Sequence, residues 1–418
     1  MSHDARPLSI KSASYIERED KYGAHNYHPL PVVLERGDGV WLWDVDGNKY
    51  LDFLSAYSAV NQGHCHPRIV STMIRQAQKL TLTSRAFHSN LLGEAEEYIA
   101  KLFGYDKVLL MNTGVEGTET AMKLARKWAY KVKGIESNKA RILFANNNFH
   151  GRTLAVISAS NDPDARNDFG PFMPGISRIA YNNLPALQRE LESDTDIAAF
   201  IVEPIQGEAG VVVPDSNYLT GVYELCKKHN VLFIADEIQT GIGRTGTMLA
   251  TDINKNAKPD MVILGKALSG GMMPVSAVLC NDNIMMTIKA GEHGSTFGGN
   301  PLACAVAMEA LKVIQDEKLA ENAAKMGQIF RDGLNSISAK NNLVQLVRGR
   351  GLLNAIVINS DEDSDVAWNI CLAFRDHGLL AKPTHGNKIR LAPPLVINEE
   401  QIHLALNIIE KCLGYFRN

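Results

Sequence analysis

Short runs of apolar, mostly β-branched residues alternate with longer amphipathic stretches through the middle of the chain. The apolar runs lie at 107–111, 140–145, 198–202, 231–235 and 261–264. Continuous apolar runs of this length predict strands that are buried on both faces, as in a parallel sheet. The stretches between them, such as 119–129 and 218–228, predict helices. This alternating order predicts an α/β fold with a mostly parallel central sheet.

The pattern changes on both sides of this region. Residues 39–53 alternate apolar and polar side chains around an Asp-Gly pair, which predicts a β-hairpin. Pro301 suits the first turn of a long helix. Strand-like segments at 347–358 and 388–391, followed by a terminal helix from Glu399 to Phe416, predict a smaller α+β unit.

We therefore expect three parts in the chain. An N-terminal segment, 1–50, is expected to pack with the small domain. A large domain spans 51–305 and a small C-terminal domain spans 306–418. A length of 418 residues suits such a division, because one hydrophobic core rarely organises so long a chain.

Composition narrows the class of partner. Hydrophobic residues make up 45% of the chain and charged residues 21%, as in ordinary globular proteins. The formal net charge of -3 is unlike that of nucleic-acid-binding proteins, and no apolar run is long enough to cross a membrane. We therefore expect small-molecule partners, with no nucleic acid and no membrane.

The cysteines and the N-terminal residues bear on the compartment. The six cysteines are widely separated and contain no CxxC pair, which favours a reducing environment. The first 20 residues carry four acidic side chains, which argues against a transit peptide. We expect a cytoplasmic protein, with the mitochondrial matrix as the alternative if a targeting peptide precedes this sequence.

Two charged residues follow predicted buried strands. Asp236 comes directly after 231–235, and Lys266 comes two residues after 261–264. Because ligands gather at the carboxyl ends of parallel strands, we expect both side chains to face one crevice. Pyridoxal phosphate needs such a pair, a lysine that forms a Schiff base and an aspartate that keeps the ring nitrogen protonated. Taken singly, Asp236 could be a helix N-cap and Lys266 an extended surface side chain.

Two further segments could complete such a site. Residues 109–120 predict a strand, a turn of small residues and a helix start whose free amides would face an anion. The purely structural alternative is a capping box between Thr113 and Glu116. The second segment is 148–153. Its Phe149 or His150 could stack on a flat ring, although an aromatic residue is by default part of the core.

Three segments, 235–246, 259–271 and 294–301, make the chain resemble the class III (subgroup II) aminotransferases over nearly its whole length. The resemblance implies the type I pyridoxal-phosphate transferase fold, with a mostly parallel central sheet and a smaller α+β domain. It implies pyridoxal 5'-phosphate as cofactor, bound by the large domain. It also implies a homodimer with shared active sites.

The resemblance assigns roles to particular residues. Lys266 and Asp236 are the implied catalytic residues, as the Schiff-base lysine and the partner of the ring nitrogen. The other implied cofactor contacts are Gly114 and Val115 at the phosphate, Phe149 on the ring, Gln239 at the ring hydroxyl, and Ser295 and Thr296 at the neighbouring subunit's phosphate.

Segments 21–31 and 54–64 resemble the branch of the class that moves the δ-amino group of ornithine to 2-oxoglutarate. The implied substrate-binding residues are Tyr27, Tyr57, Arg152, Glu203, Glu208 and Arg390. In that branch, Tyr27 binds the α-carboxylate of ornithine, and Tyr57 disfavours substrates of the 4-aminobutyrate type. Glu208 masks Arg390 while ornithine binds and then releases it for 2-oxoglutarate. Arg152 binds the second carboxylate of 2-oxoglutarate, and Glu203 lines the site.

Several alternatives stay open. The sequence Phe149-His150-Gly151 is similar to the acetylornithine and 4-aminobutyrate branches of the class. A catalytically silent protein of the same fold is disfavoured because Lys266 and Asp236 are both present.

Two other patterns resemble ligand-binding motifs, but neither has the sequence context that such a site needs. Residues 241–246 match the GxGxxG fingerprint of dinucleotide-binding proteins, but no long amphipathic helix follows them. His64-Cys65-His66 predicts no metal site, since adjacent side chains point apart and no second pair completes a ligand set.

Overall fold

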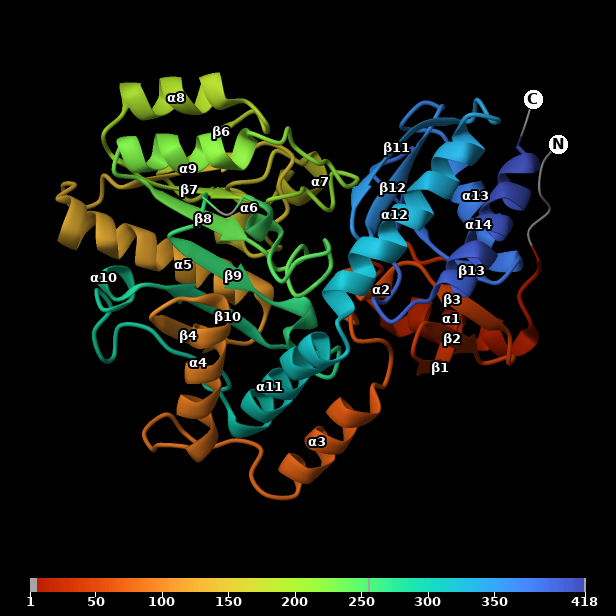
Figure 1. Ribbon diagram of the computed structural model, residues 1–418, viewed down its shortest axis with the longest axis horizontal. Coiled ribbons are helices and arrows are strands. Elements are labelled where there is room, and N and C mark those ends of the chain that lie inside the picture. Colours follow the sequence, from red (N-terminus) through yellow and green to blue (C-terminus); the bar gives the residue numbers. More distant parts are fainter. Residues whose placement is uncertain (1–5, 255, 417–418) are drawn as a thin grey trace.

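Seven strands form the central sheet of the computed structural model, which describes residues 6–254 and 256–416 (Figure 1). Their order is β4 (Lys107–Met111), β10 (Ser276–Cys280), β9 (Met261–Leu264), β8 (Leu232–Asp236), β7 (Ile197–Val202), β5 (Arg141–Ala145) and β6 (Ile176–Ile179). Every neighbouring pair from β9 to β6 is parallel. The predicted α/β fold with a mostly parallel sheet is confirmed.

All five predicted strands form within one residue of their predicted ends, but β6 and β10 were not predicted. β10 runs antiparallel to both β9 and β4. The link from Leu264 to Ser276 explains this direction, since it contains only the short 3-10 helix η3 (Lys266–Ser269). A parallel crossover usually needs a longer connection with a helix that packs on the sheet.

Alternate side chains of the strands enter two different cores, as the period of a strand requires. Phe200 and Phe233 belong to one core, and Ile201 and Ile234 to the other. Helix α5 (Gly114–Trp128) packs in the second core, while α9 (Tyr218–Lys228) and α11 (Pro301–Asp316) pack in the first. The sheet is therefore covered by helices on both faces, which explains why its strands are apolar throughout.

The remaining helices and short turns complete this part of the chain. They are α2 (Ser55–Ser58), α3 (Pro67–Ala77), α4 (Asn90–Phe103), η1 (Ala129–Lys133), α6 (Leu154–Ile157), α7 (Pro163–Arg166), α8 (Leu184–Ser193), η2 (Ala250–Ile253) and α10 (Asp282–Met285). None of the helices in the described part of the chain has both the length and the apolar character needed to cross a membrane.

The C-terminal residues form a second, antiparallel sheet. It contains β11 (Val344–Arg350), β12 (Leu353–Ile358), β15 (Lys388–Leu391) and β14 (Lys382–Thr384) in that order. Helices α12 (Leu319–Ser338), α13 (Val366–Asp376) and α14 (Glu399–Gly414) lie beside it on the right of Figure 1. The terminal helix thus forms as predicted and ends two residues before Phe416.

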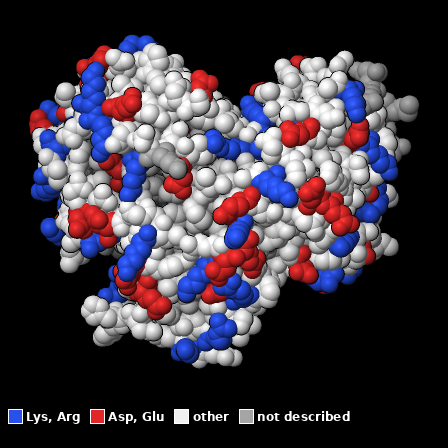
Figure 2. Space-filling view, in the orientation of Figure 1, with Lys and Arg blue, Asp and Glu red and all other residues white. Residues whose placement is uncertain are grey.

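The N-terminal segment joins this C-terminal part. The predicted hairpin is present as β2 (Trp41–Asp44) and β3 (Lys49–Asp52), with β1 (Leu34–Asp38) beside β2 and α1 (Ile10–Tyr22) before them. Strand β13 (Leu379–Leu380) pairs in parallel with β3. The central sheet with its helices forms one lobe, and the C-terminal sheet with the N-terminal hairpin forms the other (Figure 1). Figure 2 shows a notch between the two lobes. Basic and acidic side chains are intermixed on the face that it displays. The boundaries 1–50, 51–305 and 306–418 stay predictions.

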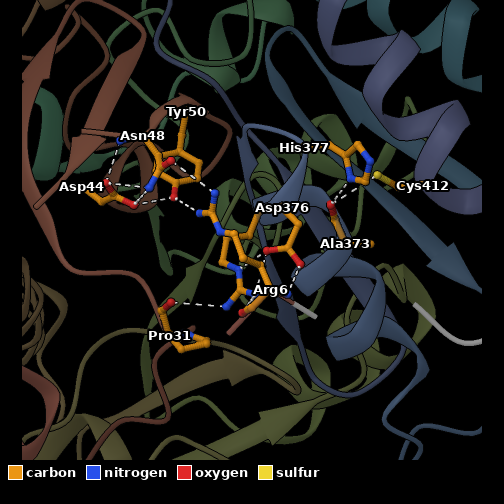
Figure 3. Close-up of polar contacts among 10 residues, drawn as sticks. Arg6, Pro31, Asp44, Asn48, Tyr50, Ala373, Asp376, His377 and Cys412 are labelled. Carbon is orange, nitrogen blue, oxygen red and sulfur yellow. Dashed lines mark hydrogen bonds and ion pairs between the residues drawn. The ribbon is translucent and has the colours of Figure 1, made fainter. Parts of the chain in front are cut away.

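A polar network holds Arg6, the first described residue, against Tyr50 of the N-terminal hairpin and Asp376 of the C-terminal part (Figure 3). The backbone N–H of Arg6 donates to the Asp376 carboxylate at 2.7 Å, and its guanidinium donates to the Tyr50 hydroxyl at 2.8 Å. That hydroxyl donates to Asp44 at 2.6 Å. Burial and the Asp44 carboxylate raise the pKa of Tyr50 to about 12, because both disfavour the phenolate.

Arg244, inside the 241–246 glycine-rich segment, links the two lobes. Its side chain is completely buried, and its Nη1 donates to the carbonyls of Leu352 and Pro393 at 3.0 and 2.6 Å. Its Nη2 donates to Asn61 Oδ1 at 2.6 Å. Burial lowers the pKa of Arg244 to about 9. The glycine-rich segment therefore supplies a buried interlobe contact, and the element that comes next after it is the short 3-10 helix η2.

We expect Arg244→Ala to destabilise the protein by about 3 kcal/mol or more, because Asn61 and two buried carbonyls lose their donor. Urea unfolding midpoints would measure the effect. Arg189→Ala is the matched control, since that arginine is exposed on α8. Equal midpoints for the two variants would contradict the linking role of Arg244.

Candidate active site

Lys266 and Asp236 lie at the carboxyl ends of adjacent parallel strands, β9 and β8. Both line one cavity of about 240 Å³. Four other residues that the sequence singled out as cofactor contacts line the same cavity, namely Gly114, Val115, Phe149 and Gln239. The structure therefore brings together groups from four separate segments of the chain.

Lys266 has an unusual backbone and an unengaged amine. Its φ of 43° is left-handed, a conformation that is costly for a residue with a Cβ and that often occurs at functional sites. No hydrogen bond or ion pair engages its amine in residues 6–254 and 256–416. Burial lowers the pKa of Lys266, although the Glu208 and Asp236 carboxylates oppose this effect. A larger fraction of the amine is therefore neutral and able to react as a nucleophile.

Asp236 is held from two sides. Its Oδ1 accepts a hydrogen bond from the backbone N–H of Ile238 at 3.1 Å, and its Oδ2 accepts one from Nδ1 of His150 at 2.6 Å. His150 is buried, and its Nε2 has no partner in the described part of the chain. Although burial opposes it, the Asp236 carboxylate raises the pKa of His150. His150 therefore fixes the direction in which the carboxylate of Asp236 points.

Glu203 lies close to this pair. Its carboxylate accepts the backbone N–H groups of Phe149 at 3.1 Å and of Gly207 at 3.3 Å. Burial raises the pKa of Glu203 to about 7, although His150 lowers it. A second buried carboxyl thus lies on the cavity wall and titrates near neutral pH.

The start of α5 forms another wall of the cavity. Thr113 caps the helix and forms the predicted capping box with Glu116. Gly114 and Val115 occupy the first helical positions, where backbone N–H groups have no partner within the helix. A Cβ on Gly114 would lie 3.0 Å from Ile238 Cδ1, so a larger residue would press into the cavity wall. The cap and the anion-binding turn are therefore compatible features of one segment.

A second cluster surrounds Arg390, which is buried on β15. Its Nη1 donates to Glu208 Oε1 and to Gln239 Oε1, both at 2.8 Å. Gln239 Nε2 donates to the same Glu208 oxygen at 3.1 Å. The Tyr57 ring centroid lies 4.8 Å from the guanidinium carbon of Arg390, within cation–π range. Although burial opposes it, Arg390 lowers the pKa of Glu208, which keeps the pair charged.

Gly207 makes room for this cluster. A Cβ at that position would lie only 1.7 Å from Gln239 Oε1. The glycine therefore lets the Gln239 amide reach both Glu208 and Arg390. Nothing in the local sequence pattern marks this requirement.

Four of the predicted site residues belong neither to the core of this cavity nor to the Arg390 cluster. Arg152 is exposed on the rim, with its guanidinium carbon 5.3 Å from the Phe149 ring centroid. Tyr27 has 74% of its surface exposed. Ser295 accepts a hydrogen bond from Asn112 at 2.8 Å and Thr296 is exposed, and neither is among the residues that line the cavity.

An outer cavity of about 450 Å³ adjoins the first and shares Phe149 and Arg152 with it. Arg348 and Lys388 add positive charge to its wall. Neither residue was singled out from the sequence, and neither was the pairing of His150 with Asp236. Arg348 and Lys388 come from the C-terminal part of the chain, and His150 and Asp236 are 86 positions apart, so no local pattern could have indicated that these groups meet.

The chain matches known proteins over almost its full length. A family model described as Aminotransferase class-III matches residues 22–413. A protein of Rattus norvegicus named Ornithine aminotransferase, mitochondrial, is 64% identical over 406 residues, which are 97% of this chain and 91% of that protein.

Solved structures of aminotransferases also match this chain over almost its full length. The ornithine aminotransferase of Toxoplasma gondii ME49 is 47% identical with a TM-score of 0.94, covering 97% of this chain and 96% of that one. An acetylornithine aminotransferase from Elizabethkingia anophelis is 59% identical with a TM-score of 0.89, covering 96% of this chain and 99% of that one.

We expect His150→Asn to retain more affinity for pyridoxal phosphate than His150→Gln. Asparagine carries its amide near the position of Nδ1, which faces Asp236, whereas glutamine carries it near Nε2, which has no partner. Losing a hydrogen bond to a charged group weakens binding by about one to two decades. Titration of each apoprotein with the cofactor would measure this, and equal losses would contradict the role of Nδ1.

Proposed function

The chain belongs to the class-III aminotransferases, and we propose that it transfers the δ-amino group of L-ornithine to 2-oxoglutarate. The products are glutamate 5-semialdehyde and glutamate. The observation that carries this proposal is the Arg390 cluster beside the Lys266 cavity, because a masked arginine suits an enzyme that alternates between a diamino acid with one carboxylate and an oxo acid with two. The names of the rat and Toxoplasma relatives support the same substrate.

Pyridoxal phosphate is the cofactor of this class, and the cavity residues fit it. Lys266 offers an amine without a partner, Asp236 a carboxylate, Phe149 a flat wall, and Gly114 and Val115 helix-start amides for the phosphate. When bound, the cofactor supplies an electron sink for the charge that develops as a C–H bond breaks beside the transferred nitrogen. Asp236 keeps the ring nitrogen protonated, and His150 orients Asp236.

Lys266 performs the proton transfer in this proposal. Its lowered pKa leaves a larger share of neutral amine, so it can act as a general base toward the δ-carbon of ornithine. Gln239 contacts the ring hydroxyl. Since both ends of its amide also engage Arg390 and Glu208, it connects the cofactor cavity with the substrate carboxylate site.

The carboxylates of the substrates are assigned to three residues, Tyr27, Arg390 and Arg152. Tyr27 binds the α-carboxylate of ornithine, and Tyr57 narrows the slot beside it. Glu208 masks Arg390 during this half-reaction and releases it for a carboxylate of 2-oxoglutarate. Arg152 binds the other carboxylate, for which its position on the rim beside Phe149 is suitable. Glu203 lines the wall behind Phe149.

We propose a homodimer in which Ser295 and Thr296 reach the partner's phosphate site. The exposure of Thr296, and of Phe297 beside it at 56%, supports this assignment. We also propose that the enzyme works in the cytoplasm, where its widely separated cysteines would stay reduced, with the mitochondrial matrix as the alternative.

Acetylornithine is the strongest competing substrate, because of the Elizabethkingia structure and the Phe149-His150-Gly151 segment. 4-Aminobutyrate is the next. Assays with each of the three donors and 2-oxoglutarate would decide between them. A higher kcat/KM for either competitor would overturn the ornithine assignment, and inactivity with all three would favour a silent protein of this fold.

Turnover should collapse in Lys266→Ala, because the described residues that line the cavity include no second lysine to form the bond to the cofactor or move the proton. Noncovalent cofactor binding should persist, since Asp236 and the α5 amides remain. Lys133→Ala is the control, as that partly buried lysine donates to the carbonyl of Ile197 and is not among the residues that line either cavity. Glutamate formation by Lys266→Ala at a rate near that of the control would refute the assignment.

Tyr27→Phe should raise KM for ornithine and change the half-reaction with glutamate much less. One hydrogen bond to a carboxylate is worth roughly 1.5 to 3 kcal/mol, which is about one to two decades in kcat/KM. Single-turnover kinetics of the two half-reactions would separate the effects. Equal losses in both would mean that Tyr27 does not select the ornithine carboxylate.

A further inference from the structure

The segment that carries Tyr57 has an unusual backbone. Helix α2 (Ser55–Ser58) consists of four consecutive residues with positive φ, at 51°, 45°, 61° and 72°, and none of them is glycine. A left-handed turn brings each Cβ close to the following carbonyl oxygen, so L-residues avoid it. Such a run persists only where surrounding contacts enforce it.

Two buried groups fix the start of this turn. The Asp52 carboxylate accepts the backbone N–H groups of Leu54 and Ser55 at 2.8 and 2.9 Å. The Ser55 hydroxyl donates to the carbonyl of Ala392 at 2.7 Å, and the N–H of Ala392 donates to the Phe53 carbonyl at 2.7 Å. The turn is therefore joined to Ala392 by hydrogen bonds from two positions.

This connection determines how Tyr57 meets Arg390. Tyr57 lies two residues after Ser55, and Arg390 lies two residues before Ala392. The Ser55 to Ala392 bond of 2.7 Å therefore joins the two segments that carry the 4.8 Å contact between the Tyr57 ring and the guanidinium carbon. Ser58 offers a contrast, because its hydroxyl is equally buried but has no partner in the described part of the chain.

We propose that Ser55 is a positioning residue that sets the selectivity for the amine donor. Its bond to Ala392 holds the left-handed turn so that Tyr57 covers Arg390. When the turn loosens, Tyr57 moves away and Arg390 becomes accessible to a donor with a single terminal carboxylate, such as 4-aminobutyrate. The inference rests on the proposed function, in which Tyr57 narrows the slot for ornithine.

The matched variants are Ser55→Ala and Ser58→Ala, measured as holoenzymes with ornithine and with 4-aminobutyrate. Both remove one buried hydroxyl from the same turn. We expect Ser55→Ala to lower the ratio of kcat/KM for ornithine to that for 4-aminobutyrate by about tenfold, mainly by raising kcat/KM for 4-aminobutyrate. Ser58→Ala should leave the ratio within about twofold, since it removes no hydrogen bond. The same ratio in both variants would overturn the proposal.

A double-mutant cycle with Tyr57→Ile tests whether Ser55 acts through Tyr57. If it does, Ser55→Ala added to Tyr57→Ile changes the ratio no further, whereas independent effects multiply and refute the proposal. Ser55→Cys, which keeps the side-chain size but donates weakly, replaces Ser55→Ala if that variant does not fold.

The same assays distinguish a failure of the proposed function from a failure of the role of Ser55. A parent enzyme that does not use ornithine, or a Tyr57→Ile variant with the parent ratio, would refute the proposed function. A shifted ratio in Tyr57→Ile together with an unshifted ratio in Ser55→Ala would refute only the role of Ser55.

Discussion

Apart from Arg152 on the rim, the charged groups of the Lys266 cavity and of the Arg390 cluster are buried or partly buried. Most of them are held by a partner from a distant part of the chain. A buried charge without a partner is costly, so each one restricts where its partner's backbone can lie. Asp236 is compensated by His150, and Arg390 by Glu208 and Gln239. Lys266 alone lacks such a partner in the described residues, and burial lowers its pKa. The amine that must react is therefore the group that the structure leaves unengaged.

This constraint also explains the irregular backbone around the cavity. Gly207 has no Cβ because the Gln239 amide needs the space, and Lys266 adopts a left-handed φ at the end of β9. The turn at Ser55–Ser58 adopts the same conformation over four residues. Such conformations are stable only when rigid neighbours impose them, and here β8, β9 and β15 are those neighbours.

Much of the fold could be predicted from local pattern. The five buried strands, the hairpin at 39–53 and the helix that begins at Pro301 all formed, because apolar period and turn residues act over a few positions. β10 and β6 were missed, since their short runs resemble ordinary loop or helix segments. The antiparallel direction of β10 depends on the short link from Leu264, which a strand pattern does not reveal.

The sequence was sufficient to place Asp236 and Lys266 at strand ends, and the capping pair Thr113 and Glu116 at a helix start, because these features depend on neighbouring residues. Pairs such as His150 with Asp236, Arg390 with Glu208, and Ser55 with Ala392 are separated by 86, 182 and 337 positions. No local preference encodes such contacts. They exist because tertiary packing, within the central sheet for His150 and Asp236 and between the two lobes for the other pairs, buries polar groups that must then find partners.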